Sequence, residues 1–309
     1  MKKTIGFILA LLVMAAAPGL RAQKFTLEEQ SQFGPGLTYH KGRLYLAWTG
    51  RDFKKQGRGG KLNVMRSDEG IDWRAKITLE EKSEHPPSIT SFNGKLYMAW
   101  TGRDEKLNII RSDDGIDWRT KITLEEQSPL EPAIIALDQR LYLIWRGRGG
   151  NDKINILRSS DGIDWTTKIT LEEKTKDRPA LASFKGRLYV SWTGRGDEKI
   201  NVMRSSNDGI DWGAKITLEE QSNVGPGICK YGDFLYLIWI GRGNEKLNIM
   251  RSDDGIDWRT KMTLEQTSKQ SPIVCAWEDS LNSKLFMAWT GRGNQKLNIS
   301  YSKDGFSFR

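Results

Sequence analysis

One phrase recurs six times along this 309-residue chain, and this repetition constrains the fold more than any other feature. The phrase joins Trp-Thr-Gly-Arg, a short gap, Lys-Leu-Asn-Ile, a Ser-x-Asp-Gly-Ile-Asp-Trp turn and Lys-Ile-Thr-Leu-Glu-Glu. Its first landmark is a tryptophan that returns every 45 to 52 residues, at Trp48, Trp100, Trp145, Trp192, Trp239 and Trp289. Repeats of this length that are rich in strand-forming and turn residues are typical of β-propeller blades.

Each repeat divides into four short segments that we expect to form strands, called a, b, c and d in chain order. In the second repeat these are residues 88–92, 95–101, 106–112 and 121–124, with an Asn-Gly turn before b and an Asp-Gly turn before d. Strand b is apolar on both faces at 96–100, as expected of a strand packed between two neighbouring blades.

The two ends of the chain predict that the repeats close into a ring. Residues 24–31 repeat the segment that ends other blades, whereas the chain stops at 305–309 without a final d strand. We therefore expect residues 24–27 to pair with the c strand near 297–301 and remove an exposed edge. An open solenoid, the alternative, would need polar capping repeats. The sequence predicts an all-β, six-bladed propeller of four-stranded antiparallel blades in one domain, residues 23–309.

Residues 1–22 are predicted to be a secretory signal peptide and not part of the fold. Lys2 and Lys3 precede an apolar run at 5–17, and Ala22 follows a Pro-Gly pair. A membrane anchor is the alternative, but the run is shorter than the ~20 apolar residues that a span needs. Cleavage near Ala22 would give an exported protein, periplasmic or extracellular, with no later segment apolar enough to span a membrane.

Composition argues against two classes of function. The chain has 48 Lys and Arg against 39 Asp and Glu, and without Lys2, Lys3 and Arg21 the balance is 45 against 39. Charges of both signs alternate within every repeat, so we expect no nucleic-acid partner, whereas an anionic glycan suits a mildly basic chain. With only His40, His85 and two cysteines available, we expect neither a metal ion nor another cofactor.

The two cysteines, Cys229 and Cys275, each lie three residues after a proline at the same place in blades five and six. A disulfide would suit an exported protein but needs Cα atoms within about 7 Å of each other. Because equivalent positions on neighbouring strands rarely face each other, we favour two free, buried thiols.

The c-to-d turns carry a recognisable motif. Five copies read Ser, two residues, Gly, two residues and an aromatic residue, while the sixth is one residue longer; they span 67–73, 112–118, 159–165, 252–258, 302–308 and 205–212. These turns resemble the Asp-box, or BNR repeat, Ser-x-Asp-x-Gly-x-x-Trp, of the sialidase (neuraminidase) superfamily. The sixth copy keeps the family spacing, with Asn207 in place of the Asp. Together with the repeat length, the resemblance covers the whole mature chain.

The resemblance also orients the molecule. In the family these turns are structural and lie opposite the ligand face, so Asp114, Asp161, Asp254 and Asp304 are expected to bind backbone N–H groups. The b-to-c loops and the d-to-a crossings then share the other face, which we call the upper face.

Two repeated elements are expected to meet on the upper face. One is an acidic crossing, such as Glu80-Glu81 or Glu125-Glu126, and the other is an arginine after each b strand: Arg51, Arg103, Arg148, Arg195, Arg242 and Arg292. Each guanidinium can hold a sugar carboxylate or sulfate through two hydrogen bonds, or pair with a glutamate of its own or the neighbouring crossing. The six tryptophans can likewise stack on a sugar ring or fill the core.

The repetition is broken in two places. Blade one has a longer b-to-c loop at 53–60, carrying Lys54, Lys55 and Arg58 and expected to overhang the upper face. The pairs before the a-strand prolines also vary: Phe33-Gly34, His85-Pro86, Leu130-Glu131, Asp177-Arg178, Val224-Gly225 and Gln270-Ser271. A binding site on the central axis would produce such variation, and unconstrained drift would look similar.

A sialidase, as the resemblance implies, needs three arginines, a tyrosine nucleophile with a glutamate partner, and an aspartate acid/base. Here Arg178-Pro179 resembles the family's Arg-x-Pro without its middle residue, and Asp177 or Glu131 could act as the acid. The b-strand tyrosines recur at one position and are therefore expected to be structural: Tyr45, Tyr97, Tyr142, Tyr189 and Tyr236.

Near-identical blades favour several equivalent weak sites, which gain avidity without chemistry. The sequence thus predicts an exported, lectin-like, glycan-binding propeller that favours acidic or polar sugars on its upper face. A sialidase-like glycoside hydrolase with one site on the axis is the alternative, and a scaffold for a protein partner is the third possibility.

Overall fold

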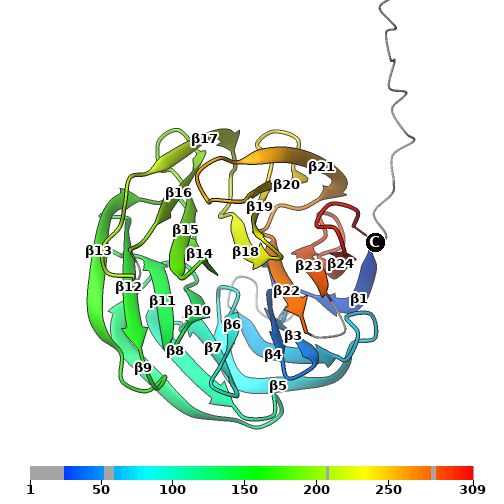
Figure 1. The fold of residues 1–309 in the computed structure, drawn as a ribbon. Coiled ribbons are helices and arrows are strands. Elements are labelled where there is room, and N and C mark those ends of the chain that lie inside the picture. Colours follow the sequence, from blue (N-terminus) through cyan, green and yellow to red (C-terminus); the bar gives the residue numbers. More distant parts are fainter. Residues whose placement is uncertain (1–23, 52–58, 207–208, 280–282, 309) are drawn as a thin grey trace, which may run out of the picture.

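The computed structural model describes residues 24–51, 59–206, 209–279 and 283–308 (Figure 1). This part of the chain forms six separate four-stranded antiparallel sheets, which stand as blades around a central axis. The predicted six-bladed propeller is thus confirmed. The predicted signal peptide and most of the longer loop of blade one lie outside the described residues.

The strands follow the order a, b, c, d from the axis outward. Blades 1 and 2 consist of β2 (Gly36–His40), β3 (Arg43–Thr49), β4 (Gly60–Ser67), β5 (Arg74–Ser83), and β6 (Ser88–Phe92), β7 (Lys95–Thr101), β8 (Lys106–Ser112), β9 (Trp118–Gln127). Blades 3 and 4 consist of β10 (Ala133–Leu137), β11 (Arg140–Arg146), β12 (Lys153–Ser159), β13 (Thr166–Lys174), and β14 (Ala180–Phe184), β15 (Arg187–Thr193), β16 (Lys199–Arg204), β17 (Ile216–Gln221). Blades 5 and 6 consist of β18 (Gly227–Tyr231), β19 (Phe234–Ile240), β20 (Lys246–Ser252), β21 (Arg259–Thr267), and β22 (Ile273–Glu278), β23 (Ser283–Thr290), β24 (Lys296–Ser302), β1 (Phe25–Gln30).

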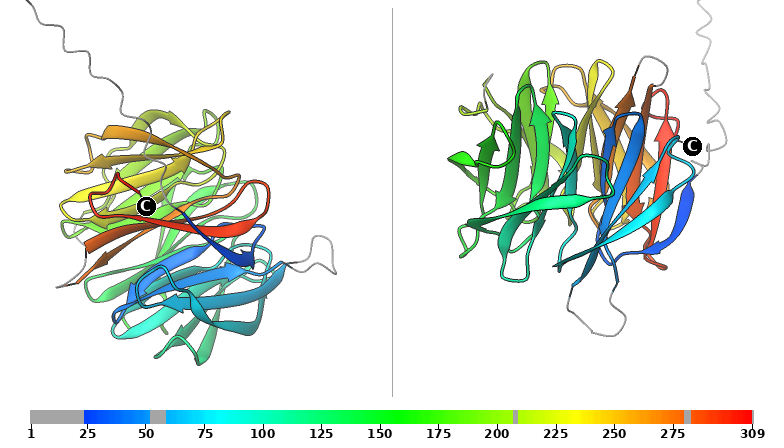
Figure 2. Two further views of the ribbon diagram at one scale, coloured as in Figure 1. Left: turned by 90° about the vertical axis from the view of Figure 1, so that its right-hand side faces the viewer. Right: turned by 90° about the horizontal axis from the view of Figure 1, so that it is seen from below.

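The ring closes through blade 6, as the chain ends predict. β1 pairs with β24 in the register Phe25↔Ile299 and Thr26↔Asn298, so the first strand of the chain completes the last blade (Figures 1 and 2). β1 ends at Gln30, three residues beyond the predicted 24–27. The innermost strand β22 also contacts β2, so every blade has a neighbour on each side.

The hydrophobic core lies between the blades and is divided into six clusters, one at each interface. Between blades 6 and 1, for example, Leu46 and Trp48 pack with Phe286. Each b strand contributes to the clusters on both of its faces, which explains why its sequence is apolar throughout. The propeller therefore depends on neighbouring blades to cover its apolar surface.

The b-to-c loops and the d-to-a crossings share the upper face, as expected. Ser83, at the end of β5, donates a hydrogen bond from Oγ to the carbonyl of Thr101, 2.8 Å away in the next blade. Thr49, at the end of β3, donates from Oγ1 to the carbonyl of His85 at 2.6 Å. These bonds fix each crossing against the loops on either side.

The c-to-d turns lie at the opposite, lower end and have the geometry expected for them. Oδ1 of Asp114 accepts hydrogen bonds from the N–H groups of Ile116 and Asp117 at 2.8 and 2.9 Å, and Gly115 has a φ of 75°. These backbone bonds hold the pKa of Asp114 below its usual value. The same pairs of N–H bonds occur at Asp161, Asp254 and Asp304.

The d strands are longer than predicted. The sequence predicts residues 121–124 for the second blade, whereas β9 runs from Trp118 to Gln127 because it stays paired with β8 up to Lys106↔Gln127. Two irregularities in this pairing accommodate the extra length. The Glu125-Glu126 pair consequently belongs to the upper end of a strand and not to the crossing.

Candidate functional site

A groove of about 510 Å³ lies between blades 6 and 1. Glu28 and Glu29 of β1 line one side, and Trp48, Arg51 and Lys76 of blade 1 line the other. A groove of about 500 Å³ occupies the equivalent place between blades 5 and 6, where Trp289 and Arg292 border it. The repeated phrase therefore builds the same kind of groove from two different pairs of blades.

The arginines of the upper face pair with acidic residues, but with a different set than predicted. Each acid belongs to the b-to-c loop of the preceding blade, in the pairs Arg148 with Glu105 at 2.6 Å, Arg195 with Asp152, Arg242 with Glu198 at 2.9 Å, and Arg292 with Glu245 at 2.6 Å. These arginine side chains are about half exposed, so each of the three pairs with a glutamate is worth roughly 0–1 kcal/mol. The arginines thus join neighbouring blades, as one of the two interpretations expected, but their partners are loop acids and not the glutamates of the crossings.

The remaining two arginines of this ring differ. Arg103 donates from Nη2 to the carbonyl of Gly59 at 3.4 Å. In blade 1 the loop position that holds the acid elsewhere is Gly60, and in blade 6 it is Gln295. The loop residues at the positions that would face Arg103 and Arg51 are therefore both uncharged.

The glutamates that were expected to meet the arginines pair with lysines. In five d strands the second glutamate bonds a lysine at or just before the d strand of the next blade: Glu29 with Lys76, Glu81 with Lys121, Glu126 with Lys168, Glu173 with Lys215, and Glu220 with Lys261, at 2.6–2.9 Å. The sixth d strand, β21, has Gln266 at this position. The first glutamate bonds a lysine within its own blade, as Glu80 does with Lys61. The glutamates meet lysines and not arginines because the longer d strands hold both glutamates in the sheet.

The six tryptophans are buried in the core clusters, each at most 1% exposed: Trp48, Trp100, Trp145, Trp192, Trp239 and Trp289. In four of them a d-strand lysine lies over the ring at 5.4–5.7 Å from its centre. A sugar could stack on such a ring only if the lysine moved. Burial therefore favours the core-packing interpretation, with Trp48 and Trp289 also bordering a groove.

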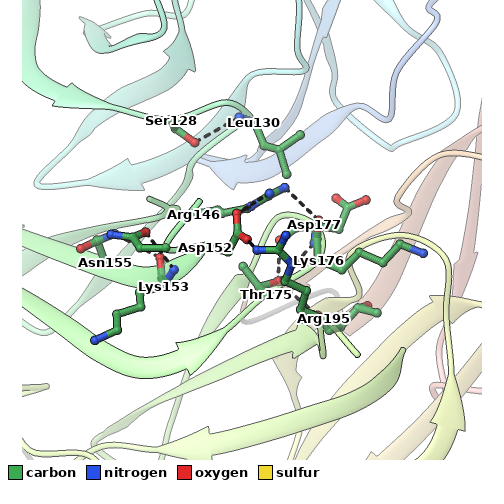
Figure 3. A network of polar contacts seen from close by, with 12 residues as sticks. Ser128, Leu130, Arg146, Asp152, Lys153, Asn155, Thr175, Lys176, Asp177 and Arg195 are labelled. Atoms are coloured by element: carbon green, nitrogen blue, oxygen red, sulfur yellow. Dashed lines mark hydrogen bonds and ion pairs between the residues drawn. The ribbon is translucent and has the colours of Figure 1, made fainter. Parts of the chain in front are cut away.

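Blades 3 and 4 carry a polar network that the sequence interpretation missed (Figure 3). Arg146 stands where other blades have Thr or Ile, and its Nε donates to Asp152 at 2.8 Å while Nη1 donates to the carbonyl of Lys176 at 3.1 Å. Arg195 also reaches this carboxylate, and Asp152 is only 2% exposed. Two breaks in the phrase signalled this network: Trp-Arg-Gly-Arg in place of Trp-Thr-Gly-Arg, and Asp before the c-strand lysine.

A separate cavity, of about 280 Å³, lies on the central axis among the innermost strands. Glu131 and Arg178, from the varied positions before the prolines, lie at its upper rim, with Arg178 Nε 3.2 Å from Glu131 Oε1. Arg178 also donates from Nη2 to the carbonyl of Pro272 at 3.1 Å. Burial raises the pKa of Glu131 to about 7, against the opposing effect of Arg178 and with a further increase from Asp177.

The axial cavity brings together part of the predicted catalytic set. Glu131 and Arg178 form an ion pair, and the N–H of Arg178 donates to the carboxylate of Asp177 at 2.6 Å. No tyrosine is among the described residues that line this cavity. The b-strand tyrosines point to the lower face instead, where Tyr45, Tyr97 and Tyr189 donate to the carbonyls of Asp114, Asp161 and Asp254.

Cys229 and Cys275 border the same cavity from the neighbouring strands β18 and β22. Both are free thiols, as predicted, although the cavity leaves each of them partly exposed. Enclosure raises the pKa of both groups, that of Cys275 to about 12. Both cysteines are therefore protonated at neutral pH and poorly suited to nucleophilic attack.

Among the described residues, no three His, Cys, Asp or Glu side chains are grouped so that they could hold a metal ion. Within the same ranges there is no helix long and apolar enough to cross a membrane.

No protein-family model matches this chain, and no curated protein matches it. Among solved structures, the chain is similar to the Hadza microbial sialidase Hz136, at 17% identity and a TM-score of 0.67. The match covers 89% of this chain and 66% of the sialidase, just under two thirds of its length. Activity and substrates of the whole sialidase are therefore not transferred by this likeness.

Two further solved structures have the same architecture. The Aleuria aurantia lectin, as a point mutant in complex with Fucα1-6GlcNAc, has 12% identity, a TM-score of 0.69, and coverage of 91% of this chain and 96% of the lectin. The NanB sialidase from Streptococcus pneumoniae has 11% identity, a TM-score of 0.66, and coverage of 91% and 69%. At such low identity these likenesses establish the propeller fold alone.

Proposed function

We propose that this protein is a lectin-like propeller that binds glycans in the upper-face grooves between its blades. The observation that carries this proposal is the groove of Arg51, where one guanidinium, three lysines and two glutamates line a space of about 510 Å³ beside Trp48. Small-molecule sites use a few convergent polar groups to orient their ligand. The equivalent groove of Arg292 supports several sites per chain, which would act through avidity.

The charge of the grooves favours acidic or polar sugars. Arg51, Lys61, Lys76 and Lys82 line the first groove together with Glu28 and Glu29. Lys61 pairs with Glu80 and Lys76 with Glu29, so the cations still outnumber the acids around them. An excess of cations attracts a carboxylate or sulfate, and an arginine can hold either group through two parallel hydrogen bonds. Neutral sugars can use the same donors through their hydroxyl groups.

Arginine variants test the proposal. Arg148→Ala should weaken glycan binding, measured by isothermal titration against sugars selected on a glycan array, by about tenfold. Its melting temperature should change little because the side chain is half exposed. Arg195→Ala should act in the same direction, and Arg146 remains to pair with Asp152.

Arg119→Ala, which breaks an exposed pair with Asp117 on the lower face, is the matched control. Unchanged binding with a large loss of stability would mean that the arginines only join the blades.

A sialidase-like glycoside hydrolase is the second candidate, favoured by one observation. The pKa of Glu131, raised to about 7 at the rim of the axial cavity, suits a general acid near neutral pH. Incubation with a fluorogenic sialoside tests it. Release of the fluorescent group by the wild type, and its loss in Glu131→Gln, would establish hydrolysis and contradict a purely binding function.

Export is a further part of the proposal, and it rests on residues 1–22. N-terminal sequencing of the protein recovered from the exported fraction should begin near Gln23. A mature protein that still began at Met1 would contradict it.

A further inference from the structure

The lysine at the start of the d strand of blade 6, Lys24, lacks the carboxylate that its counterparts have. In the other five blades this lysine bonds the second glutamate of the preceding d strand at 2.6–2.9 Å. Lys24 comes just before β1, and the corresponding residue of the preceding d strand, β21, is Gln266. Among the described residues, the side chain of Lys24 has no ion pair and no hydrogen bond. Its positive charge is therefore not compensated by a partner.

The counterparts of Lys24 are also held against aromatic rings. In four blades the lysine lies over the b-strand tryptophan, 5.4–5.7 Å from the ring centre. The b-strand tryptophan of blade 6 is Trp289, and none of the described lysines or arginines lies over its ring. The ammonium group of Lys24 is thus held by neither kind of contact and can turn towards a ligand.

Lys24 lines a groove that is large enough for a sugar. This is the groove of about 500 Å³ between blades 5 and 6. Glu265 and Gln266 border it from blade 5, and Trp289 and Arg292 border it from blade 6. The unpaired lysine therefore belongs to one of the two grooves in which we propose that sugars bind.

The other charged groups at this groove have partners. Arg292 Nε lies 2.6 Å from Glu245 Oε2, and Lys269 Nζ lies 3.9 Å from Glu245 Oε1. Glu265 lines the groove itself, and its carboxylate is 3.0 Å from Lys246 Nζ. Both acids are thus already engaged by cations other than Lys24.

The charge at position 266 determines what Lys24 can bind. Where this residue is a glutamate, its carboxylate neutralises the neighbouring ammonium group and repels a second anion. Gln266 has polar contacts of its own, but an amide carries no charge and does neither. Lys24 can therefore donate a charge-assisted hydrogen bond to an anionic group that enters the groove.

We propose that the groove between blades 5 and 6 binds the carboxylate or sulfate group of an acidic sugar at Lys24. Gln266 is a residue that determines this specificity, and it acts through Lys24 by leaving the ammonium group unpaired. This inference rests on the proposed glycan-binding function.

The first test removes the free charge in two ways. Isothermal titration of the protein would use methyl glucuronide as the carboxylate, galactose 6-sulfate as the sulfate ester, and the methyl ester of the glucuronide as the neutral probe. Lys24→Met and Gln266→Glu should each weaken acidic-sugar binding at one site per chain by at least about tenfold. The double variant should lose no further site, because both changes act on the same groove. Binding of the neutral ester should not change.

The second test creates an unpaired lysine in the other groove. Glu29→Gln removes the carboxylate that lies 2.6 Å from Lys76, which lines the groove between blades 6 and 1. This variant should raise the affinity of that groove for methyl glucuronide by about tenfold. Gln139→Glu, which adds a negative charge at an exposed turn on the lower face, is the matched control for Gln266→Glu. It should leave all binding unchanged.

Folding is checked by thermal melting. Gln266→Glu introduces the residue that the other five d strands have at this position, so we expect it to fold. If it does not, Lys24→Met and Glu29→Gln carry the test.

Three results would overturn the inference. They are unchanged acidic-sugar binding in both Lys24→Met and Gln266→Glu, equal losses for the acidic and the neutral probe, and binding of inorganic sulfate as tight as that of galactose 6-sulfate, which would indicate a simple anion site. In each case binding of neutral sugars would leave the proposed function intact. If no sugar binds, charged or neutral, the proposed function itself fails.

Discussion

At the scale of single residues, the same phrase contains side chains with opposite roles. Trp145 is 1% exposed and belongs to the cluster between blades 2 and 3, whereas the side chain of Arg148, three residues later, is 54% exposed. The tryptophan therefore contributes to stability through buried apolar area, and the arginine remains available at the surface. Proximity in the sequence does not imply a shared function.

The first prediction compares these two residues. Trp145→Ala should lower the free energy of unfolding by about 3–5 kcal/mol, because it leaves a cavity between two blades. Arg148→Ala should lower it by about 0–1 kcal/mol. Urea unfolding of both variants would measure the difference, and similar losses for the two would contradict this division of roles.

The second prediction concerns Glu131, whose pKa is raised from 4.5 to about 7 by burial. Between these values the folded state holds the proton more tightly than the unfolded state. The stability that this group contributes is thus greatest at low pH and falls as the pH rises through the window. The melting temperature of the wild type, relative to Glu131→Gln, should therefore decrease between about pH 4.5 and pH 7. A constant or increasing difference would mean that Glu131 is not held in its neutral form.

At the scale of elements, the c-to-d turn is a local device. Asp161 Oδ1 accepts N–H bonds from Ile163 and Asp164 at 2.8 and 2.9 Å and a bond from Ser159 Oγ at 3.0 Å. These bonds hold the pKa of Asp161 below its usual value. Its stabilising contribution is present above the unfolded-state pKa and is lost as the pH falls towards the folded-state value.

The third prediction follows from this turn. Asp161→Ala should lower the free energy of unfolding by about 1 kcal/mol at neutral pH, since two N–H groups lose a charged acceptor at an exposed site. The difference from the wild type should shrink under acid conditions. Asp164→Ala, at an exposed position in the same turn, is the control. An equal effect of both changes would show that the N–H bonds do not stabilise the turn.

The elements also show what sequence reasoning can reach. Strand period, turn residues and the complementary ends of the chain predict the blades and their closure, because these signals are local or terminal. The partner of Arg148 could not be predicted, because Glu105 belongs to another blade and points to the arginine only through a left-handed loop conformation, with φ of 61°. The acid before the c-strand lysine, present in blades 2 to 5 and absent in blades 1 and 6, was a readable signal in the sequence.

At the scale of the whole molecule, stability depends on ring closure. β24 has one edge covered by β23 and the other by β1, and the ion pair between Lys296 and Glu28 joins the two ends of the chain at 2.8 Å. An open ring would expose both a strand edge and the apolar face of a blade.

The fourth prediction is that a chain beginning at Gln32, which lacks β1, cannot remain a stable monomer. Size-exclusion chromatography with light scattering should show association or aggregation through the edge of β24. Addition of a peptide of residues 24–31 should restore the monomer by completing blade 6. A stable monomer without β1 would contradict the closure mechanism.

The central claim, that sugars bind in the grooves between blades, is tested most directly by a crystal structure of the protein soaked with methyl glucuronide. The account predicts electron density for the sugar in the grooves on either side of blade 6, with its carboxylate on Lys24 between blades 5 and 6. Density only in the axial cavity, at Glu131 and Arg178, would contradict it.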